Sequence, residues 1–269
     1  MYLTDYHAHT TISPDARTTI TQLCRAAVDA GVQEVCVTDH WNLADQQGVL
    51  SLGPLDWTPS LKQWKAARTK FTGQVELRLG VEVGNGLLDP DAVAQSLALP
   101  ELDFVIGSLH SAGDKYGHVG FYTAAHQVQT REEAVALLED YVDLTLRLAQ
   151  SDGYDVLGHI NYPLRYLPQE YHLTWEPWWD QLAEALRAVI AQGKGIEVNT
   201  TQATADVNEW LPYLRLYRDL GGEVLTFGAD SHRPHQVGGL IREAREVARS
   251  VGFRWVTTYK HRVPFFTAL

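Results

Sequence analysis

Short apolar runs that are typical of strands alternate with amphipathic segments that are typical of helices along this chain. Seven such runs are expected to form strands, at residues 2–8, 32–40, 75–83, 102–110, 154–160, 195–200 and 223–232. Helices are expected near residues 18–30, 60–72, 132–150, 178–192, 209–220 and 236–251, and one further strand at residues 254–259. Strands that alternate with helices in this way favour a parallel sheet covered by helices.

The longest irregular stretches follow the predicted strands rather than precede them. They cover residues 41–58, 85–100, 111–130, 160–177 and 200–208. Barrel enzymes build their active sites from long loops at the carboxyl ends of their strands. No repeat and no linker rich in Gly, Ser or Pro divides the 269 residues. We therefore predict one barrel domain over residues 1–269, with a doubly wound open sheet as the alternative.

The composition excludes several classes of partner. The net charge of −11 argues against a broad nucleic-acid or membrane surface, because phosphate groups would be repelled over most of the exterior. No apolar run reaches the roughly 20 residues of a membrane helix, and no signal peptide is recognisable. Cys24 and Cys36 lie in a helical and a strand pattern, so both are expected to be small buried hydrophobes. We expect a cytoplasmic protein whose partner is a small molecule.

Side chains that can bind metal ions end most of the predicted strands. Six of the eleven histidines occupy such positions, with carboxylates and one amide beside them: His7, His9, Asp39, His40, Glu82, His110, His159, Glu197, Asn199, Asp230 and His232. Residues two apart in a strand point to the same side, so His7 and His9 can bind one ion together. Imidazole and carboxylate without cysteine suit Zn²⁺, Mn²⁺ or Fe²⁺, and the set exceeds what one ion can use.

Each of these features also occurs at ordinary strand ends. The pair His7 and His9 can be two hydrogen-bonded polar side chains, Asp39 can cap a helix, and Glu82 can be a buried, paired carboxylate. Structural accidents of this kind would scatter over both ends of the strands, whereas these residues recur at one end. The pattern therefore favours a multinuclear metal centre.

Six short motifs follow one another in an order that is specific to one family. They are "HAH" at 7–9, "TDH" at 38–40, "GVEV" at 80–83, "SLH" at 108–110, "GH" at 158–159 and "ADSH" at 229–232. With them the chain resembles the polymerase-and-histidinol-phosphatase (PHP) superfamily of metallophosphoesterases, and its histidinol-phosphatase-like branch in particular. The resemblance implies a distorted (β/α)7 TIM-like barrel with a trinuclear metal site at the carboxyl ends of its strands.

The resemblance also implies a set of nine metal ligands. They fall into three groups, one for each ion: His7, His9 and Asp230; Glu82 as a bridge, with His110 and His159; and Asp15, His40 and His232. Many relatives have a histidine at the position of Asp15, and a carboxylate there makes the site harder and more anionic. Asp5 and Asp39 are expected to orient imidazoles from outside the ligand set, or to be structural carboxylates.

Three divalent ions in one cleft suit the hydrolysis of a phosphomonoester. Two ions that share a bridging water lower its pKa and aim a hydroxide at phosphorus, and the third neutralises the phosphate oxygens and the leaving alkoxide. We therefore expect an enzyme in which Glu82 and Asp230 serve catalysis through the metals. His232, or a water on a metal, would protonate the leaving group.

The run "YDVLGHINYPLRY" at 154–166 resembles the histidinol-phosphatase branch, with Arg165 in the place of a phosphate-contacting arginine. Arg17 and Arg233 are further phosphate candidates because they adjoin Asp15 and His232, and Asn199 lies in "IEVNT", which also resembles the branch. The substrate implied is L-histidinol phosphate, in histidine biosynthesis.

Two departures from the branch keep other substrates open. Asn161 stands where the branch usually has aspartate, and no basic residue follows Thr201 in "TQATADVNEW". Another small phosphomonoester, such as a nucleotide, a sugar phosphate or a phosphopeptide, is the alternative. An amidohydrolase-type deaminase would use a carboxylated lysine in place of Glu82, and a non-catalytic PHP module would have lost ligands. The tryptophans at 175, 178 and 179 line a ring-binding pocket or pack in the core. Native metals and oligomeric state stay open.

Overall fold

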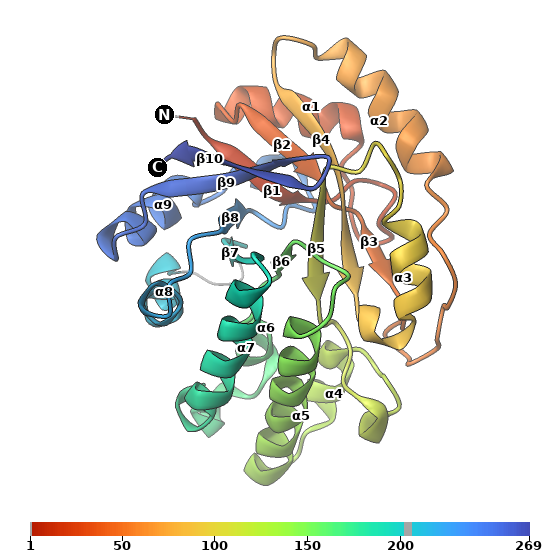
Figure 1. Ribbon diagram of the computed structural model, residues 1–269. Helices are drawn as coiled ribbons and strands as arrows, with labels where there is room; N and C mark the ends of the chain where they lie inside the picture. Colours follow the sequence, from red (N-terminus) through yellow and green to blue (C-terminus); the bar gives the residue numbers. More distant parts are fainter. Residues whose placement is uncertain (1, 202–205) are drawn as a thin grey trace.

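The computed structural model describes residues 2–201 and 206–269, and its centre is a parallel sheet that curls into a barrel (Figure 1). The strands that pair in order are β1 (Thr4–Ala8), β2 (Glu34–Val37), β4 (Glu76–Gly84), β5 (Phe104–Ser108), β6 (Val156–Leu157), β7 (Gly195–Asn199) and β8 (Leu225–Gly228). Backbone hydrogen bonds join the two edges: the N–H of His9 donates to the carbonyl of Ser231 over 2.9 Å, and that of Ser231 donates to the carbonyl of His7. The predicted distorted TIM-like barrel is thereby confirmed.

One predicted strand is divided in two. The run at 32–40 forms β2 and then breaks, and β3 (His40–Asn42) begins a new pairing with the carboxyl half of β4. The parallel register of β3 places His40 beside Glu82. This break is what brings the "TDH" motif to the middle of the barrel's carboxyl end.

Helices connect the strands on the outside of the barrel. They are α1 (Ile20–Ala30), α2 (Thr58–Lys70), α3 (Pro90–Ser96), α4 (Phe121–Gln127), α5 (Arg131–Ala149), α6 (Tyr162–Tyr166), α7 (Trp179–Ala191), α8 (Leu211–Asp219) and α9 (Ile241–Ser250). Capping boxes begin α1 and α5, and Gly31 ends α1 with φ of 72°. The short helices α3, α4 and α6 lie in stretches expected to be irregular, because so few turns leave no readable period. Among the described residues, no helix is long and apolar enough to cross a membrane.

An antiparallel hairpin of β9 (Trp255–Lys260) and β10 (Val263–Ala268) covers the amino-terminal end of the barrel. The N–H of Tyr259 donates to the hydroxyl of Tyr6 over 2.7 Å, and Arg262 forms an ion pair with Asp155 at 2.8 Å. The sequence predicted β9 but not β10. Since the hairpin closes this end, the carboxyl end is the one that can receive a ligand.

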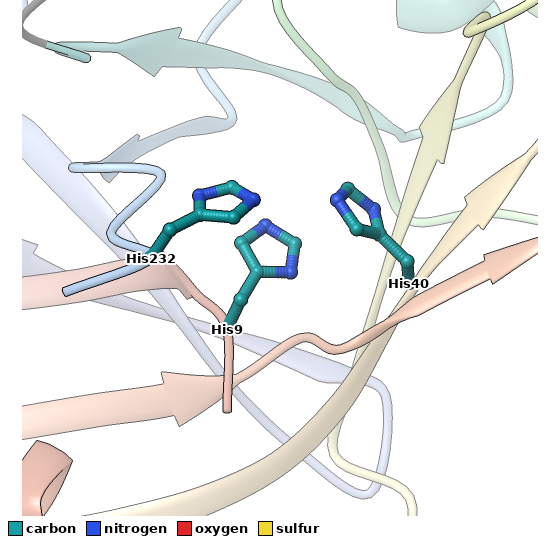
Figure 2. A group of neighbouring side chains, drawn as sticks. All are labelled: His9, His40 and His232. Carbon is teal, nitrogen blue, oxygen red and sulfur yellow. The ribbon is translucent and has the colours of Figure 1, made fainter. Parts of the chain in front are cut away.

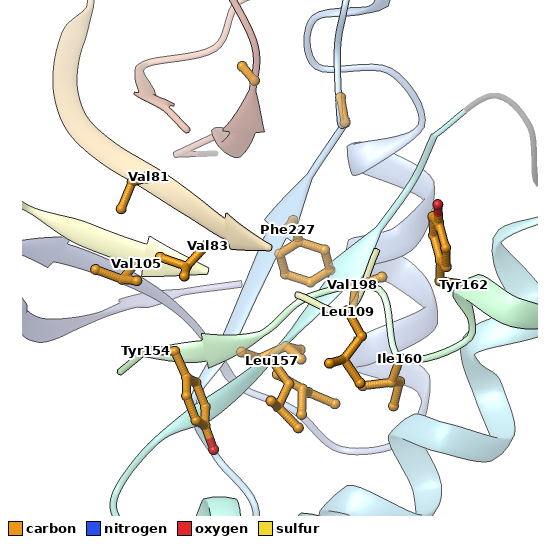
Figure 3. Packing of buried hydrophobic residues seen from close by; sticks show 14 of the residues in the cluster. Val81, Val83, Val105, Leu109, Tyr154, Leu157, Ile160, Tyr162, Val198 and Phe227 are labelled. Carbon is orange, nitrogen blue, oxygen red and sulfur yellow. The ribbon is translucent and has the colours of Figure 1, made fainter. Parts of the chain in front are cut away.

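Apolar side chains fill the space on both sides of the strands. Figure 3 shows Val81, Val105, Val198 and Phe227 packed together with residues of the connecting segments. Parallel strands of this kind are buried on both faces, which explains why they read as nearly continuous apolar runs. Cys24 and Cys36 are free and buried, as predicted.

Candidate metal centre

The candidate ligands come together at the carboxyl end of the barrel. His7 and Glu82 lie within β1 and β4, and His40 opens β3. The others follow the ends of strands by one to four residues: His9, His110, His159, Asp230 and His232. Their side chains meet because parallel strands that start at one end of a barrel also finish together.

Glu82 lies at the middle of the cluster and is fully buried. Its Oε2 lies 3.3 Å from Nε2 of His7 and 2.6 Å from Nδ1 of His40. Its Oε1 lies 3.1 Å from Nε2 of His110 and 3.0 Å from Nε2 of His159. Burial alone would raise the pKa of Glu82, but the surrounding imidazoles hold it well below its usual value. One ionised carboxylate therefore faces imidazoles from both sides of the barrel.

His7, His9 and Asp230 form one group in which ligand atoms lie close enough to share an ion. Oδ1 of Asp230 lies 3.1 Å from Nε2 of His9 and 3.6 Å from Nε2 of His7. Burial lowers the pKa of His9 to about 3, and the neighbouring His40 acts in the same direction. His9 is thus a neutral imidazole, which is the form that binds metal ions.

A second group joins the imidazoles of His9, His40 and His232, which Figure 2 shows facing one another from three parts of the chain. The ring centroid of His9 lies 4.1 Å from that of His40 and 4.3 Å from that of His232. Oδ2 of Asp15 lies 3.5 Å from Nε2 of His40 and 3.4 Å from Nε2 of His232. The third group that can share an ion contains His40, Glu82 and His110. His40 therefore lies between two potential ion positions.

Several buried ligand atoms in this cluster face one another without a hydrogen bond of regular geometry. Oε2 of Glu82 lies 3.3 Å from Nε2 of His7 and 2.6 Å from Nδ1 of His40, and the three atoms make no other hydrogen bond among the described residues. Unsatisfied buried polar atoms are rare in folded proteins, because each costs the free energy of its lost hydration. Here their lone pairs converge from three strands, so the donor set fits divalent metal ions.

Carboxylate, amide and hydroxyl groups outside the cluster fix which nitrogen of three imidazoles faces inward. Nδ1 of His7 lies 2.5 Å from Oε1 of Glu197, and Nδ1 of His110 lies 2.8 Å from Oδ1 of Asn42. Nδ1 of His9 lies 3.3 Å from the hydroxyl of Ser13. Sequence reasoning noticed Glu197 but gave it no partner, and it missed Asn42 and Ser13.

Asp5 and Asp39 were expected either to orient imidazoles or to be structural carboxylates, and neither has a hydrogen bond to an imidazole among the contacts of the described residues. Asp5 accepts hydrogen bonds from the backbone N–H groups of Ala229 and Gly238, so it ties β1 to the loop after β8. Asp39 accepts from the hydroxyl of Ser13 over 2.7 Å, and it reaches His9 only through that hydroxyl. Both carboxylates hold backbone and loop in place, as the structural alternative supposed.

The candidate phosphate-binding residues occupy different surroundings. Arg165 lies in α6, with its Cζ 5.8 Å from the ring centroid of Tyr162, and that ring lies 4.9 Å from the ring of His159. Arg17 and Arg233 are exposed, and only their neighbours Asp15 and His232 reach the cluster. Nδ2 of Asn199 donates to Oδ2 of Asp230 over 3.2 Å.

The three tryptophans after β6, at positions 175, 178 and 179, lie in different surroundings. Trp175 and Trp179 line a cavity of about 1170 Å³ beside Arg165, whereas Trp178 does not line that cavity and packs in the core. Of the run "TQATADVNEW" at 201–210, which has no basic residue, residues 202–205 lie outside the described residues.

Comparison with known proteins identifies the family. The model of the PHP domain matches residues 5–201, so the chain belongs to the PHP domain family. It is 30% identical over 264 residues to a probable histidinol-phosphatase of Deinococcus radiodurans, with 97% of each chain covered. It is 27% identical over 259 residues to the histidinol-phosphatase of Lactococcus lactis, covering 95% of this chain and 93% of the relative. The resemblance stated from the motifs is confirmed.

A solved structure agrees with the fold. The histidinol phosphate phosphatase of Lactococcus lactis, crystallised with Zn, L-histidinol and phosphate, superposes with a TM-score of 0.83. The two chains are 23% identical, and 98% of each is covered.

Proposed function

We propose that this protein hydrolyses a phosphomonoester at a centre of divalent metal ions and that its substrate is L-histidinol phosphate. The observation that carries the proposal is the position of the fully buried Glu82, whose two oxygens lie 2.6 to 3.3 Å from nitrogens of four imidazoles. A bridging carboxylate between histidines is the arrangement that multinuclear hydrolases use. The relatives that match over nearly the whole length supply the substrate class.

The ligand sets of the proposal follow the three groups implied by the motifs. Three ions, Zn²⁺, Mn²⁺ or Fe²⁺, would be held by His7, His9 and Asp230; by Glu82, His110 and His159; and by Asp15, His40 and His232. Bound there, such ions lower the pKa of a water molecule and neutralise charge on the phosphate oxygens. The distances of 3.4 and 3.5 Å from Asp15 to its two histidines support its place in the third set.

The protein's own side chains complete the reaction. Hydrolysis joins a water oxygen to phosphorus and breaks the ester P–O bond, and the alcohol oxygen takes up a proton. Arg165 would bind the phosphate oxygens with its planar guanidinium, with Arg17 and Arg233 closer to the solvent. Asn199 holds Asp230 in place through its amide.

The proton for the leaving alcohol would come either from His232 or from a water molecule at the metal centre. Burial alone would lower the pKa of His232, but the hydrogen bond to Asp15 and the charge of Asp230 raise it above the usual value. A proton and a third ion cannot share Nε2 of His232, so a water molecule takes over this role when that ion is bound. As an enzyme of histidine biosynthesis, the protein would work in the cytoplasm, which cell fractionation would test.

A second candidate substrate is another small phosphomonoester. The observation that favours it is the side chain of Asn161, which is buried and whose Oδ1 has no partner among the described residues. An aspartate there would carry a charge for a cationic substrate, whereas Asn161 is neutral.

The test compares turnover of the zinc- or manganese-loaded protein on L-histidinol phosphate, nucleoside monophosphates, phosphotyrosine and phenyl phosphate. We expect kcat/KM for L-histidinol phosphate to exceed that for phenyl phosphate by about a hundredfold or more, since buried polar contacts to the alcohol are lost with the simple ester. Equal values would refute the histidinol assignment and leave the phosphatase assignment standing. No turnover of any phosphomonoester by metal-loaded protein would refute both.

A further inference from the structure

A cavity of about 1170 Å³ is lined by Asn161, two residues after the candidate ligand His159, and by none of the nine candidate ligands themselves. It lies between α6, the segment that leads to α7, and the start of α8. The residues that line it include Asn161, Arg165, Trp175, Trp179, Glu209 and Tyr213. Cavities of about 300–1000 Å³ hold drug-sized ligands. This one therefore exceeds the space that a single imidazole ring and its short chain would fill.

Two residues of the cavity wall lie near His159 of the candidate metal centre. Asn161 follows His159 by two residues and forms part of the wall. Arg165 also forms part of the wall, and its Cζ lies 5.8 Å from the ring of Tyr162, which in turn contacts the ring of His159. A substrate whose phosphate lies beside His159 and Arg165 can thus extend its alcohol portion into the cavity.

Two polar residues of this wall have unused hydrogen-bonding atoms. Oδ1 of Asn161, and Nε and Nη2 of Arg165, are buried and have no partner among the described residues. Asn161 as a whole residue is only 7% exposed. Buried polar groups are nearly always paired in native proteins. A ligand that offers acceptors to Arg165 and a hydroxyl or ammonium donor to Asn161 would satisfy them.

The remaining wall is aromatic with a negatively charged rim. Trp175 is buried, and the rings of Trp179 and Tyr213 lie 5.7 Å apart at an angle of 49°. The carboxylates of Glu176 and Glu209 are exposed at the edge of the same cavity. Aromatic faces attract flat rings and cations, and carboxylates favour cations further. The wall therefore matches an amino alcohol that carries a flat ring.

We propose that this cavity receives the alcohol portion of the substrate and that the enzyme accepts phosphomonoesters of amino alcohols with rings larger than imidazole. The proposal rests on the proposed phosphatase function. It differs from that function in naming a second substrate class, of which L-tryptophanol phosphate is the simplest representative.

The first experiment measures kcat/KM of the zinc-loaded protein for L-tryptophanol phosphate and for ethanolamine phosphate, which has the ammonium but no ring. We expect a ratio above one that falls about tenfold in Trp179→Ala, the loss of one good aromatic contact. Glu209→Gln, a surface change that spares folding, should lower kcat/KM for both substrates by about twofold to fivefold and leave their ratio unchanged, because both carry the ammonium group and a screened carboxylate contributes little. Trp255→Ala and Glu243→Gln, at exposed positions far along the chain on β9 and α9, are the matched controls.

The second experiment separates the two proposals. L-Tryptophanol alone is titrated into metal-free protein and into Trp179→Ala, and binding is followed by calorimetry. Binding that Trp179→Ala weakens supports the cavity assignment even if no phosphomonoester is hydrolysed. Turnover of L-histidinol phosphate together with an unchanged substrate ratio in Trp179→Ala would overturn the cavity assignment and leave the phosphatase intact. Absence of L-tryptophanol binding to the wild-type protein would also overturn it.

Discussion

Oε1 of Glu197 lies 2.5 Å from Nδ1 of His7, although 190 residues separate them along the chain. The contact fixes the imidazole so that Nε2 points at Glu82 and Asp230. The other oxygen of Glu197 accepts a hydrogen bond from the backbone N–H of His159 over 3.0 Å. One buried carboxylate therefore positions parts of two proposed ion sites. Carboxylates that hold metal-binding histidines in this way also raise the basicity of the imidazole.

Replacing Glu197 by glutamine should weaken metal binding without unfolding the barrel. The amide keeps the size of the side chain but lacks the charge, so we expect a loss of about tenfold to a hundredfold in affinity for Zn²⁺. Competition with a chromogenic chelator measures that affinity. The matched control is Glu184→Gln, at an exposed position of α7. Equal affinities of both variants and the wild-type protein would show that Glu197 is only a structural partner of the strand.

Metal binding should release protons. Burial alone would lower the pKa of His40, but Glu82 and Asp15 raise it to about 10, so the metal-free imidazole is protonated at neutral pH. An ion must displace this proton, and the apparent affinity should therefore rise about tenfold per pH unit for each proton released, between about pH 6 and pH 8. Calorimetric titrations with Zn²⁺ in two buffers of different ionisation enthalpy count the protons. Identical heats in the two buffers would contradict the expectation.

Exchange of Asp15 for histidine should change the preference among metals. A third imidazole beside His40 and His232 is a softer ligand than a carboxylate. We expect the ratio of the affinity for Zn²⁺ to the affinity for Mn²⁺ to be about tenfold higher in Asp15→His than in the wild-type protein, because nitrogen replaces oxygen in the ligand set. Parallel titrations with the two ions give the ratio, and Asp29→His at an exposed position of α1 is the control. An unchanged ratio would remove Asp15 from the ligand set.

The hairpin at the other end of the barrel contributes stability rather than catalysis. Arg262 is the partner of the largely buried Asp155, whose pKa is raised by burial even though Arg262 acts to lower it. Removing the arginine leaves that carboxylate unpaired, so Arg262→Ala should lower the free energy of unfolding by about 3 kcal/mol. Urea denaturation measures the change, and the double variant with Asp155→Asn should recover part of it. The exposed pair of Arg249 and Glu246 provides the control, because Arg249→Ala should change stability by less than about 1 kcal/mol.

The alternation of strands and helices could be predicted from the sequence. The clustering of the residues at strand ends could also be predicted, because parallel strands bring their carboxyl ends together whatever the course of the loops. The contact of Glu197 with His7 could not, because it depends on the closure of the barrel, which places β7 and β1 on either side of β8. Asn42 gave no signal either, since its role follows from the separate pairing of β3 with β4. Short helices such as α6, which carries Arg165, are too short for a readable apolar period.

The most direct test of the central claim, that this cluster is a hydrolytic metal centre, is the turnover of L-histidinol phosphate by zinc-loaded His9→Ala. His9 contacts Asp230, His40 and His232, so its loss affects two of the groups that can share an ion. We predict that kcat/KM falls by about a thousandfold or more and that bound zinc decreases, while circular dichroism stays that of the folded barrel. His126→Ala, at an exposed position of α4, should retain full activity. Wild-type turnover by folded His9→Ala would contradict the account.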